Sequence, residues 1–300
     1  SPQMPGMIRL LPGNEVIMEN DHRDTLCHFK AGSAHYRFPT RSYDDFPLVE
    51  EMDRVNVCKL RCSDFIETTR LVSYAAAAEK NNPVFNGIYF EIKGSVFAMA
   101  ATNTHRLATK DMSLTMPATS EGRMIVPSGI LSDVCKLLPV EEDAEVEVSW
   151  AKSHAAFTFG NTYFITNLIS GQYPDYHRVI PSRFDVEAVF NLKELSDAIR
   201  MVSPISRDVS YNTVNFNFDD NQVEIYAEDS DIGGSKVSIP AKLSGLLPLS
   251  IIFNCSYIED ILKHSTGDTI TLHLMNRGPM LVEQEEDKNY KYVVTPMRGK

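Results

Sequence analysis

Two patterns of hydrophobic and polar positions run along the chain, and the first is helical. In four stretches apolar residues recur every three or four positions, which places them on one face of a helix. The first stretch opens at Ser63, the second at Ser128, and the third at Asn191 with Glu194 three residues later; the fourth includes Tyr257. Ser and Asn are favoured N-caps, and a Glu at that spacing is typical of a capping box. The pattern predicts four amphipathic helices.

The second pattern is a short run that alternates apolar and polar residues or is rich in β-branched and aromatic residues. Such runs are typical of β-strands. The predicted strands are residues 85–90, 96–101, 145–150, 155–159, 163–168, 213–218, 223–227, 270–274 and 290–294. Because two amphipathic helices accompany each group of strands, we expect an α+β fold in which two helices pack on antiparallel sheets.

The predicted elements also repeat along the chain. The sequence RLVS at residues 70–73 recurs as RMVS at residues 200–203, and the flanking strand patterns correspond. A fixed-period repeat indicates one structural unit that is used more than once. We therefore expect a central repeat at residues 52–181 and a C-terminal repeat at residues 182–300.

Residues 1–51 resemble only the later half of such a unit. Arg9–Pro12 matches Lys136–Pro139, which lies late in the central repeat. We expect residues 1–51 to be a partial first repeat that lacks its front half, with Ser1–Gly6 set aside as a loop or a vector scar. If that half is absent from the protein, its apolar face is uncovered, which predicts poor solubility or a monomeric chain.

Composition narrows the class of protein. The chain is 43% hydrophobic, which is too high for disorder, and its apolar runs are far shorter than the roughly 20 residues of a membrane-spanning helix. The five cysteines are Cys27, Cys58, Cys62, Cys135 and Cys255. Their odd number, and the lack of a second ligand pair near Cys58 and Cys62, favour reduced thiols in a cytoplasmic protein over disulfides or a zinc site. We expect no metal and no cofactor.

Three short segments are poorly explained by packing alone. They are ATNTHRLA at residues 101–108, YPDYHRVIP at residues 173–181 and YVVTPMR at residues 292–298. In order and spacing they resemble the hallmark segments of bacterial beta sliding clamps, the processivity subunit of DNA polymerase III, in which ATDGHRLA, FPDYRRVLP and YVVMPMR are usual. The resemblance covers residues 7–298.

The resemblance implies a ring of repeated clamp domains. In that family three similar domains form a subunit, and two subunits join head to tail around duplex DNA, with the helices on the inner surface. The residues that would face DNA are Arg70, Lys80, Lys136, Lys193, Arg200 and Lys263. Their contacts would be with backbone phosphates, without sequence specificity. Judged from the residues alone, the helix faces also carry acidic side chains and the net charge is −11, so a mixed solvated surface remains the alternative.

The resemblance also implies a hydrophobic peptide-binding pocket between the central and C-terminal repeats. Its residues would be Phe85, Thr102, Thr104, His105, Arg106, Leu107, Pro174, Arg178, Val179, Asn254, Tyr257, Met280, Pro296, Met297 and Arg298. Two departures bear on its shape. Asn103-Thr104 replaces the usual Asp-Gly, so a positive φ there would strain the turn, and Thr295 replaces a Met and would make one wall smaller and more polar.

The implied partners follow from the family. They are double-stranded DNA, the polymerase alpha subunit, the clamp loader, other polymerases and repair proteins with clamp-binding motifs, and a second copy of the chain in a head-to-tail homodimer. The dimer would use an edge strand within residues 30–38, with Lys30, Tyr36 and Phe38, against Ile205 and the acidic residues 228–231. Exposed sheet edges require such a partner.

The resemblance implies no intrinsic catalysis, because this subunit is the non-catalytic part of a nucleotidyltransferase holoenzyme. Two alternatives stay open from the residues. One is a β-rich adaptor that binds peptides but not DNA. The other is a hydrolase that uses His105 with Asp175 and a serine, although no nucleophile elbow, phosphate loop or zinc-binding HExxH motif is present in the sequence.

Overall fold

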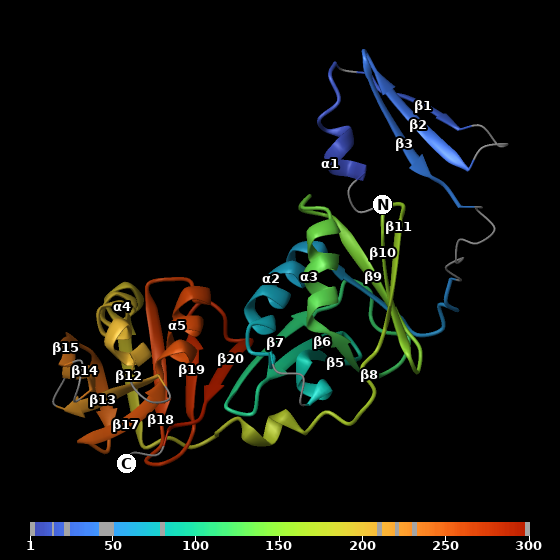
Figure 1. Cartoon of the computed structure of the whole chain (residues 1–300). Coiled ribbons are helices and arrows are strands. Elements are labelled where there is room, and N and C mark those ends of the chain that lie inside the picture. Colours follow the sequence, from blue (N-terminus) through green and yellow to red (C-terminus); the bar gives the residue numbers. More distant parts are fainter. Residues whose placement is uncertain are drawn as a thin grey trace. The chain divides into compact units, whose positions relative to one another are not determined.

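A computed structural model describes residues 4–13, 15–20, 25–41, 51–78, 82–208, 212–219, 222–229 and 233–297. The chain forms two compact units, residues 1–51 and residues 52–300 (Figure 1). Within the described residues, no helix is long and apolar enough to cross a membrane. All five cysteines are free thiols, and all except the half-buried Cys135 are buried.

The first unit is a small sheet with one short helix. Its elements are α1 (Met4–Ile8), β1 (Ile17–Asn20), β2 (Leu26–Ala31) and β3 (Ala34–Pro39), with the strands antiparallel in the order β1-β2-β3. Cys27, Phe29 and Ala31 alternate along β2 and form its core with Leu11. Residues 4–6 are not a loop or a vector scar, contrary to the expectation from sequence, because they form the first part of α1.

The central repeat contains two α-helices among its strands. Its elements are β4 (Val57–Arg61), α2 (Cys62–Ser73), η2 (Pro83–Asn86), β5 (Gly87–Lys93), β6 (Val96–Thr102), β7 (Arg106–Ser113), β8 (Gly122–Pro127), α3 (Ser128–Leu137), β9 (Glu145–Trp150), β10 (His154–Phe159), β11 (Thr162–Asn167) and the linker helix η3 (Tyr176–Val179). Helix α2 contacts β4, β6 and β7, and α3 contacts β8.

The elements of the C-terminal repeat follow a similar order, with one more strand between the two helices. They are β12 (Val186–Asn191), α4 (Leu192–Asp208), β13 (Thr213–Asp219), β14 (Gln222–Asp229), β15 (Gly233–Pro240), β16 (Lys242–Gly245), β17 (Leu249–Asn254), α5 (Cys255–His264), β18 (Thr269–Leu274), β19 (Met280–Gln284) and β20 (Tyr290–Val294). In Figure 1 the four longer helices lie on one side of this second unit, and the segment with η3 crosses its other side.

One sheet joins the two repeats. In the described residues it has nine strands in the order β16-β12-β18-β19-β20-β7-β6-β5-β8, and we call it the long sheet. The junction is the antiparallel pair β7 and β20, with Leu107 opposite Val293 and Ala108 opposite Tyr292. We call this pair the seam. Because it continues a hydrogen-bonded ladder across both repeats, residues far apart in sequence become neighbours.

The four predicted helices are all present, but two predicted caps are wrong. Helix α2 has Arg61 at its N-cap position, two residues before the predicted cap, so Ser63 lies inside the helix and caps nothing. Ser128 is the first residue of α3 and follows Pro127 at its N-cap position. Asn191 does cap α4, because its Oδ1 accepts the Glu194 N–H at 3.0 Å. An apolar run places a helix well, whereas its first residue depends on the preceding strand.

The strand prediction missed several strands and misplaced one boundary. Residues 83–86 form η2, so the strand predicted from residue 85 starts only at Gly87. Strands β7 and β8 were not predicted, although β7 forms half of the seam. Thr109, Lys110 and Asp111 in β7 break the apolar alternation, and only its pairing with β20 makes this segment a central strand.

Candidate functional site

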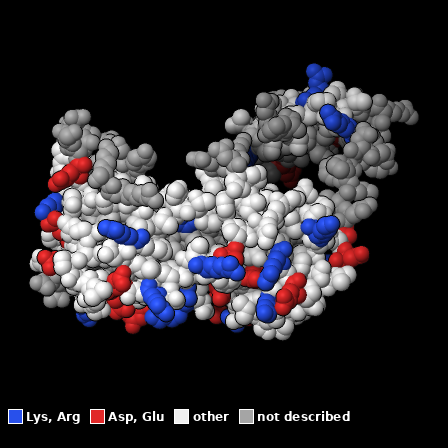
Figure 2. All heavy atoms as spheres, turned by 90° about the horizontal axis from the view of Figure 1, so that it is seen from below, with Lys and Arg blue, Asp and Glu red and all other residues white. Residues whose placement is uncertain are grey.

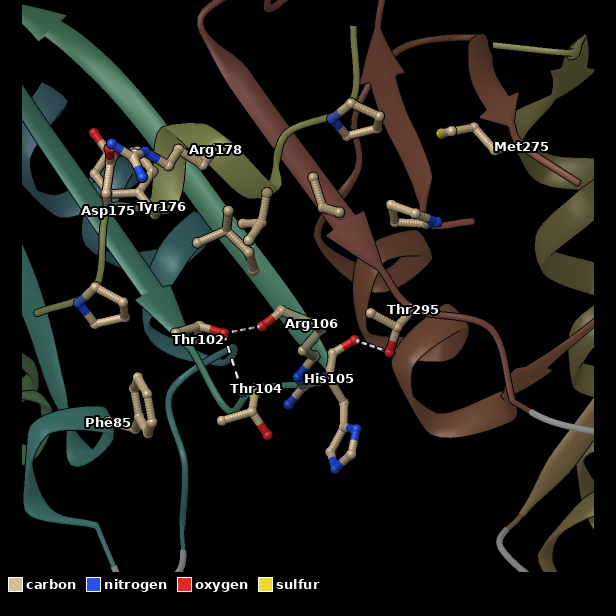
Figure 3. Close-up of a pocket in the computed structure, with 16 residues that line it drawn as sticks. Phe85, Thr102, Thr104, His105, Arg106, Asp175, Tyr176, Arg178, Met275 and Thr295 are labelled. Carbon is tan, nitrogen blue, oxygen red and sulfur yellow. Dashed lines mark hydrogen bonds and ion pairs between the residues drawn. The ribbon is translucent and has the colours of Figure 1, made fainter. Parts of the chain in front are cut away.

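A cleft of about 500 Å³ lies over the seam (Figure 3). Nine residues of the predicted pocket line it, namely Phe85, Thr102, Thr104, His105, Arg106, Leu107, Pro174, Arg178 and Val179. The other lining residues are Asp175, Tyr176, Pro181, Met275, Pro279, Val293 and Thr295. The cleft thus receives side chains from both repeats and from the linker between them.

The floor of the cleft is the seam itself. Leu107 of β7 and Val293 of β20 face each other across the ladder and belong to a small buried cluster with Tyr176 of η3. This cluster lies on the face of the long sheet opposite the main core, because residues alternate between faces along a strand. The apolar floor therefore exists only when the two repeats are paired.

The turn between β6 and β7 forms one end of the cleft and holds a strained residue. Thr104 has φ of +78°, the left-handed region that disfavours a Cβ. Side chains within the turn offset this strain: Asn103 Oδ1 accepts the N–H groups of His105 and Arg106 at 3.1 and 3.0 Å, and Thr102 Oγ1 accepts that of Thr104 at 3.1 Å. Thr104, which stands where the family usually has Gly, thus adopts the strained backbone conformation that was expected.

Thr295 closes the other side of the turn. Its N–H and its hydroxyl both donate to the carbonyl oxygen of His105, at 2.9 and 3.0 Å (Figure 3). These bonds extend the seam by one step beyond β20. The hydroxyl proton of Thr295 is thus donated within the protein, while the hydroxyl oxygen keeps its acceptor capacity.

Arg106 lines the cleft with part of its length, but its guanidinium lies elsewhere. The side chain is only 9% exposed and forms an ion pair with Asp260 of α5. The guanidinium donates to the carbonyl of Tyr74 and stacks against the rings of Tyr74 and Tyr257, 5.4 and 4.6 Å from their centroids. The guanidinium of Arg106 is therefore already bonded within the protein, and this arginine links the two repeats.

Five more predicted pocket residues do not line the cleft. Asn254 caps α5 by accepting the Tyr257 N–H at 3.4 Å, and Tyr257 lies beneath Arg106. Met280 is 1% exposed in the main core. Pro296 and Met297 are half-buried beside β17, where the Met297 N–H donates to the Ile252 carbonyl at 2.8 Å. Arg298 lies outside the described residues.

Some lining residues were not predicted. Met275 and Pro279 come from the turn between β18 and β19, and Asp175, Tyr176 and Pro181 belong to the linker. The linker residues stand within the YPDYHRVIP segment and could have been found there. Met275 and Pro279 had no such signal, because the pairing of β19 with β20 brings their turn to the cleft.

A second feature is the helical side of the same unit. Arg70, Lys136, Lys193, Arg200 and Lys263 are exposed on α2, α3, α4, α4 and α5 respectively. Lys80 lies outside the described residues. A groove of about 450 Å³ between α4 and α5 is lined by Arg200, Lys263 and Arg207, the last of which was not predicted.

These bases are partly neutralised. Lys193 and Arg200 flank Asp197 at 2.9 and 3.4 Å, and the hydrogen bond from Lys193 lowers the pKa of Asp197. Lys136 pairs with Asp133 at 2.9 Å, and Arg207 pairs with Glu259 at 3.4 Å. Figure 2 shows another face of the protein, on which basic and acidic side chains are interleaved. The helical surface can attract an anion only weakly.

The residues predicted for a dimer interface lie at two sheet edges or near them. Lys30 is in β2, the middle strand of its sheet, and pairs with Glu19 at 2.6 Å, so it is not on the edge strand. Tyr36 and Phe38 are on the edge strand β3 and pack on the small core. Ile205 packs partly against the main core. Residues 230 and 231 of the predicted acidic run lie outside the described residues.

Comparison with known proteins agrees with this geometry. Residues 59–175 match a family model for the central domain of the DNA polymerase III beta subunit, and residues 177–298 match one for its C-terminal domain. The beta sliding clamp of Staphylococcus epidermidis is 24% identical over 294 residues, which are 97% of this chain and 77% of that protein.

Solved structures show the same fold. A sliding clamp from Bacillus subtilis has a TM-score of 0.92 at 22% identity and covers 100% of this chain and 79% of its own. A DnaN sliding clamp from Pseudomonas aeruginosa, bound to griselimycin, has a TM-score of 0.89 at 25% identity, with 99% and 80% covered. Because two domain models of one family together match most of its length, the chain belongs to the DNA polymerase III beta subunits, the beta sliding clamps, which are non-catalytic processivity factors of DNA replication.

Proposed function

We propose that the cleft over the seam captures short linear segments of replication and repair proteins. The polymerase alpha subunit, the clamp loader, and other polymerases and repair proteins with clamp-binding motifs are the partners that we assign to it. The main observation in support is an apolar cleft built from both repeats, with Val179 54% exposed at its rim. An exposed aliphatic side chain beside an apolar floor is suited to a peptide that buries both.

The cleft also has polar groups at its border. Arg178 is exposed and its Nε donates to Asp175 at 2.9 Å, so the pair can exchange with the backbone or the carboxylate of a ligand. Met275 adds an adaptable side chain that can fit different residues. These features support recognition of a short motif rather than of a folded surface.

A fluorescent peptide of the Gln-Leu-x-Leu-Phe type tests this proposal. We expect micromolar binding that Val179→Glu weakens by at least about tenfold, because a charge replaces apolar contact at the rim. The matched control is Val140→Glu, since Val140 is 86% exposed away from the cleft. Equal affinities in the two variants would refute the site, and so would a wild-type chain that is folded but does not bind.

We further propose that the helical side of residues 52–300 faces double-stranded DNA through Arg70, Lys136, Lys193, Arg200 and Lys263. The arrangement supports loose attraction, because acids on the same helices offset several of these bases. Weak, exposed phosphate contacts can hold duplex near the surface without fixing it in one place. The groove between α4 and α5 adds Arg207 to this set.

The DNA proposal is tested by charge reversal at low salt. Arg200→Glu should weaken binding of a non-specific duplex by about tenfold and reduce the dependence of affinity on salt concentration. Arg123→Glu is the control, because Arg123 is equally basic and exposed but lies on β8 of the long sheet. If Arg200→Glu and Arg123→Glu lower the affinity for duplex DNA equally while peptide binding stays intact, the result would favour the alternative of a peptide-binding adaptor that does not bind DNA.

We propose a cytoplasmic, head-to-tail homodimer as the working form. The seam supplies the support for this arrangement, because it shows how an edge strand of one repeat pairs with the last strand of the next. Among the described residues, β15 pairs only with β14, and β3 pairs only with β2. Strand β15 occupies the position in its repeat that β7 has in the central repeat, and β3 ends its unit as β20 does.

A further inference from the structure

The bond between Thr295 and His105 stands out among the polar contacts of the cleft. It links two residues that are 190 positions apart and belong to different repeats. Both donors of Thr295, its N–H and its hydroxyl, converge on the one carbonyl oxygen of His105 (Figure 3). The N–H could donate from any residue at this position except proline. The hydroxyl bond, in contrast, requires a Thr or a Ser.

The carbonyl that Thr295 binds belongs to the strained turn. His105 follows Thr104, whose φ is +78°, and the hydrogen bonds that hold Thr104 come from within the same turn. The turn is also tied to the C-terminal repeat by the ladder pair of Arg106 with Val294 and by Asn103, whose Nδ2 donates to the Tyr257 hydroxyl at 3.1 Å. Thr295 adds a bond at the end of the seam, where it reaches from the segment after β20 to the carbonyl of His105.

We propose that Thr295 is a positioning residue that holds the peptide cleft in its binding-competent shape. This inference rests on the proposed peptide-binding function. The hydroxyl ties the turn of the central repeat to the last strand of the C-terminal repeat, so that Thr104, His105 and the floor residues keep a fixed spacing. A ligand then finds a formed wall and does not lose affinity to the ordering of that wall.

The hydroxyl bond also decides what Thr295 presents to a ligand. Because its proton is donated to His105, Thr295 offers a ligand its methyl group and the acceptor capacity of its hydroxyl oxygen, but no donor. Thr102 likewise donates its hydroxyl proton, to the Arg106 carbonyl at 2.6 Å, and its oxygen accepts the Thr104 N–H.

Two substitutions at one position separate this role from packing. Thr295→Val keeps the shape and removes the hydroxyl, and Thr295→Ser keeps the hydroxyl and removes the methyl group. Using the fluorescent peptide on the full chain, we expect Kd to rise about three- to tenfold in Thr295→Val, because one cross-repeat hydrogen bond is lost. We expect Thr295→Ser to remain within about twofold of wild type.

A stability measurement shows whether the effect is specific to binding. Thr119→Val is the control: its hydroxyl donates to the Val55 carbonyl at 2.9 Å, and Thr119 does not line the cleft. Thr119→Val should lower the thermal midpoint without changing Kd. An unchanged Kd in Thr295→Val, or an equal loss in the Val and Ser variants, would overturn the positioning role. Failure of the wild-type chain to bind would instead refute the proposed function on which it rests.

Discussion

The residues that join the repeats on the helical side form a cluster around Arg106. Its guanidinium lies among Tyr74, Tyr257 and Asp260, and the ring of His264 stacks on Tyr74 with centroids 4.2 Å apart. The His264 Nδ1–H donates to the Asp260 carbonyl at 2.8 Å. Burial disfavours a positive charge on His264, and the charges of Arg70 and Lys263 disfavour it further, whereas Asp260 favours it.

This cluster predicts a pH dependence of stability. Burial lowers the pKa of His264 below its usual 6.5. At a pH between the pKa of His264 in the folded chain and its pKa in the unfolded chain, the unfolded chain is protonated at His264 while the folded chain is not. The contribution of neutral His264 to stability is therefore present above pH 6.5 and is lost as the pH falls through the folded pKa. The free energy of unfolding, measured with urea, should decline as the pH falls below 6.5.

The variant His264→Phe keeps a ring against Tyr74 and removes the titration. It should show a smaller decline in the free energy of unfolding than the wild-type chain. His154→Phe is the matched control, because His154 lies in β10, outside the cluster, and should keep the wild-type decline. A pH profile of His264→Phe that parallels the wild type would contradict the assignment.

At the scale of elements, helices with similar apolar stripes begin in different ways. Helix α4 has a side-chain cap, in which Asn191 accepts the Glu194 N–H. Helix α2 has no side-chain cap, and its first turn continues directly from β4 through Arg61. Strand β12 leads into α4 just as directly, with Asn191 paired opposite Thr269. The difference therefore lies in the N-cap residue, because the Asn191 side chain has an acceptor oxygen whereas the Arg61 guanidinium has only donors.

The caps give a direct prediction for stability. Asn191→Ala should lower the free energy of unfolding by about 1 kcal/mol, because an N–H at the start of α4 loses its acceptor. Ser63→Ala should change it by less than about 0.5 kcal/mol, since Ser63 is exposed and caps nothing. Urea denaturation monitored by circular dichroism measures both values. A loss in Ser63→Ala as large as that in Asn191→Ala would contradict this reading of α2.

At the scale of the whole molecule, the repeat is the organising feature. The seam pairs β7 of one repeat with β20 of the next, and both carry their core side chains on the helical side. The same relation between two copies would pair β15 with β3, whose core-facing residues are Val237 and Tyr36 among others. In this pairing β3 takes the place of β20 and β15 takes the place of β7. If Tyr36 occupies the position that Tyr292 has in the seam, Ala34 lies opposite Val237.

Cysteine cross-linking tests this intermolecular register. A chain with Ala34→Cys and Val237→Cys should form disulfide-linked dimers under mild oxidation, because opposite residues of paired strands lie within disulfide reach. In the control pair, Ala34→Cys with Lys236→Cys, the second cysteine points to the other face of β15, so little cross-linking is expected. Cross-linking that is equal in both chains, or a monomer by light scattering at all concentrations, would exclude the proposed dimer.

The candidate site was predicted only in part, and the errors have a common cause. Residues within the three hallmark segments, such as Leu107 and Val179, do line the cleft. Arg106 lies in the same segment, yet its guanidinium turns to Asp260 and Tyr257, because a buried charge is stabilised only beside its partners. Met280 is buried in the main core and Met275 lines the cleft instead, a difference set by the turn between β18 and β19.

The sequence by itself determined the features that depend on neighbouring residues. Apolar spacing located α2, α3, α4 and α5, and the repeat and the hallmark segments identified the family. Only the tertiary structure decided that β7 and β20 form a seam, that Thr295 reaches His105, and that Arg106 joins the repeats. Helical periodicity is a local property, whereas strand pairing and the burial of a charge depend on residues that come together only when the chain is folded.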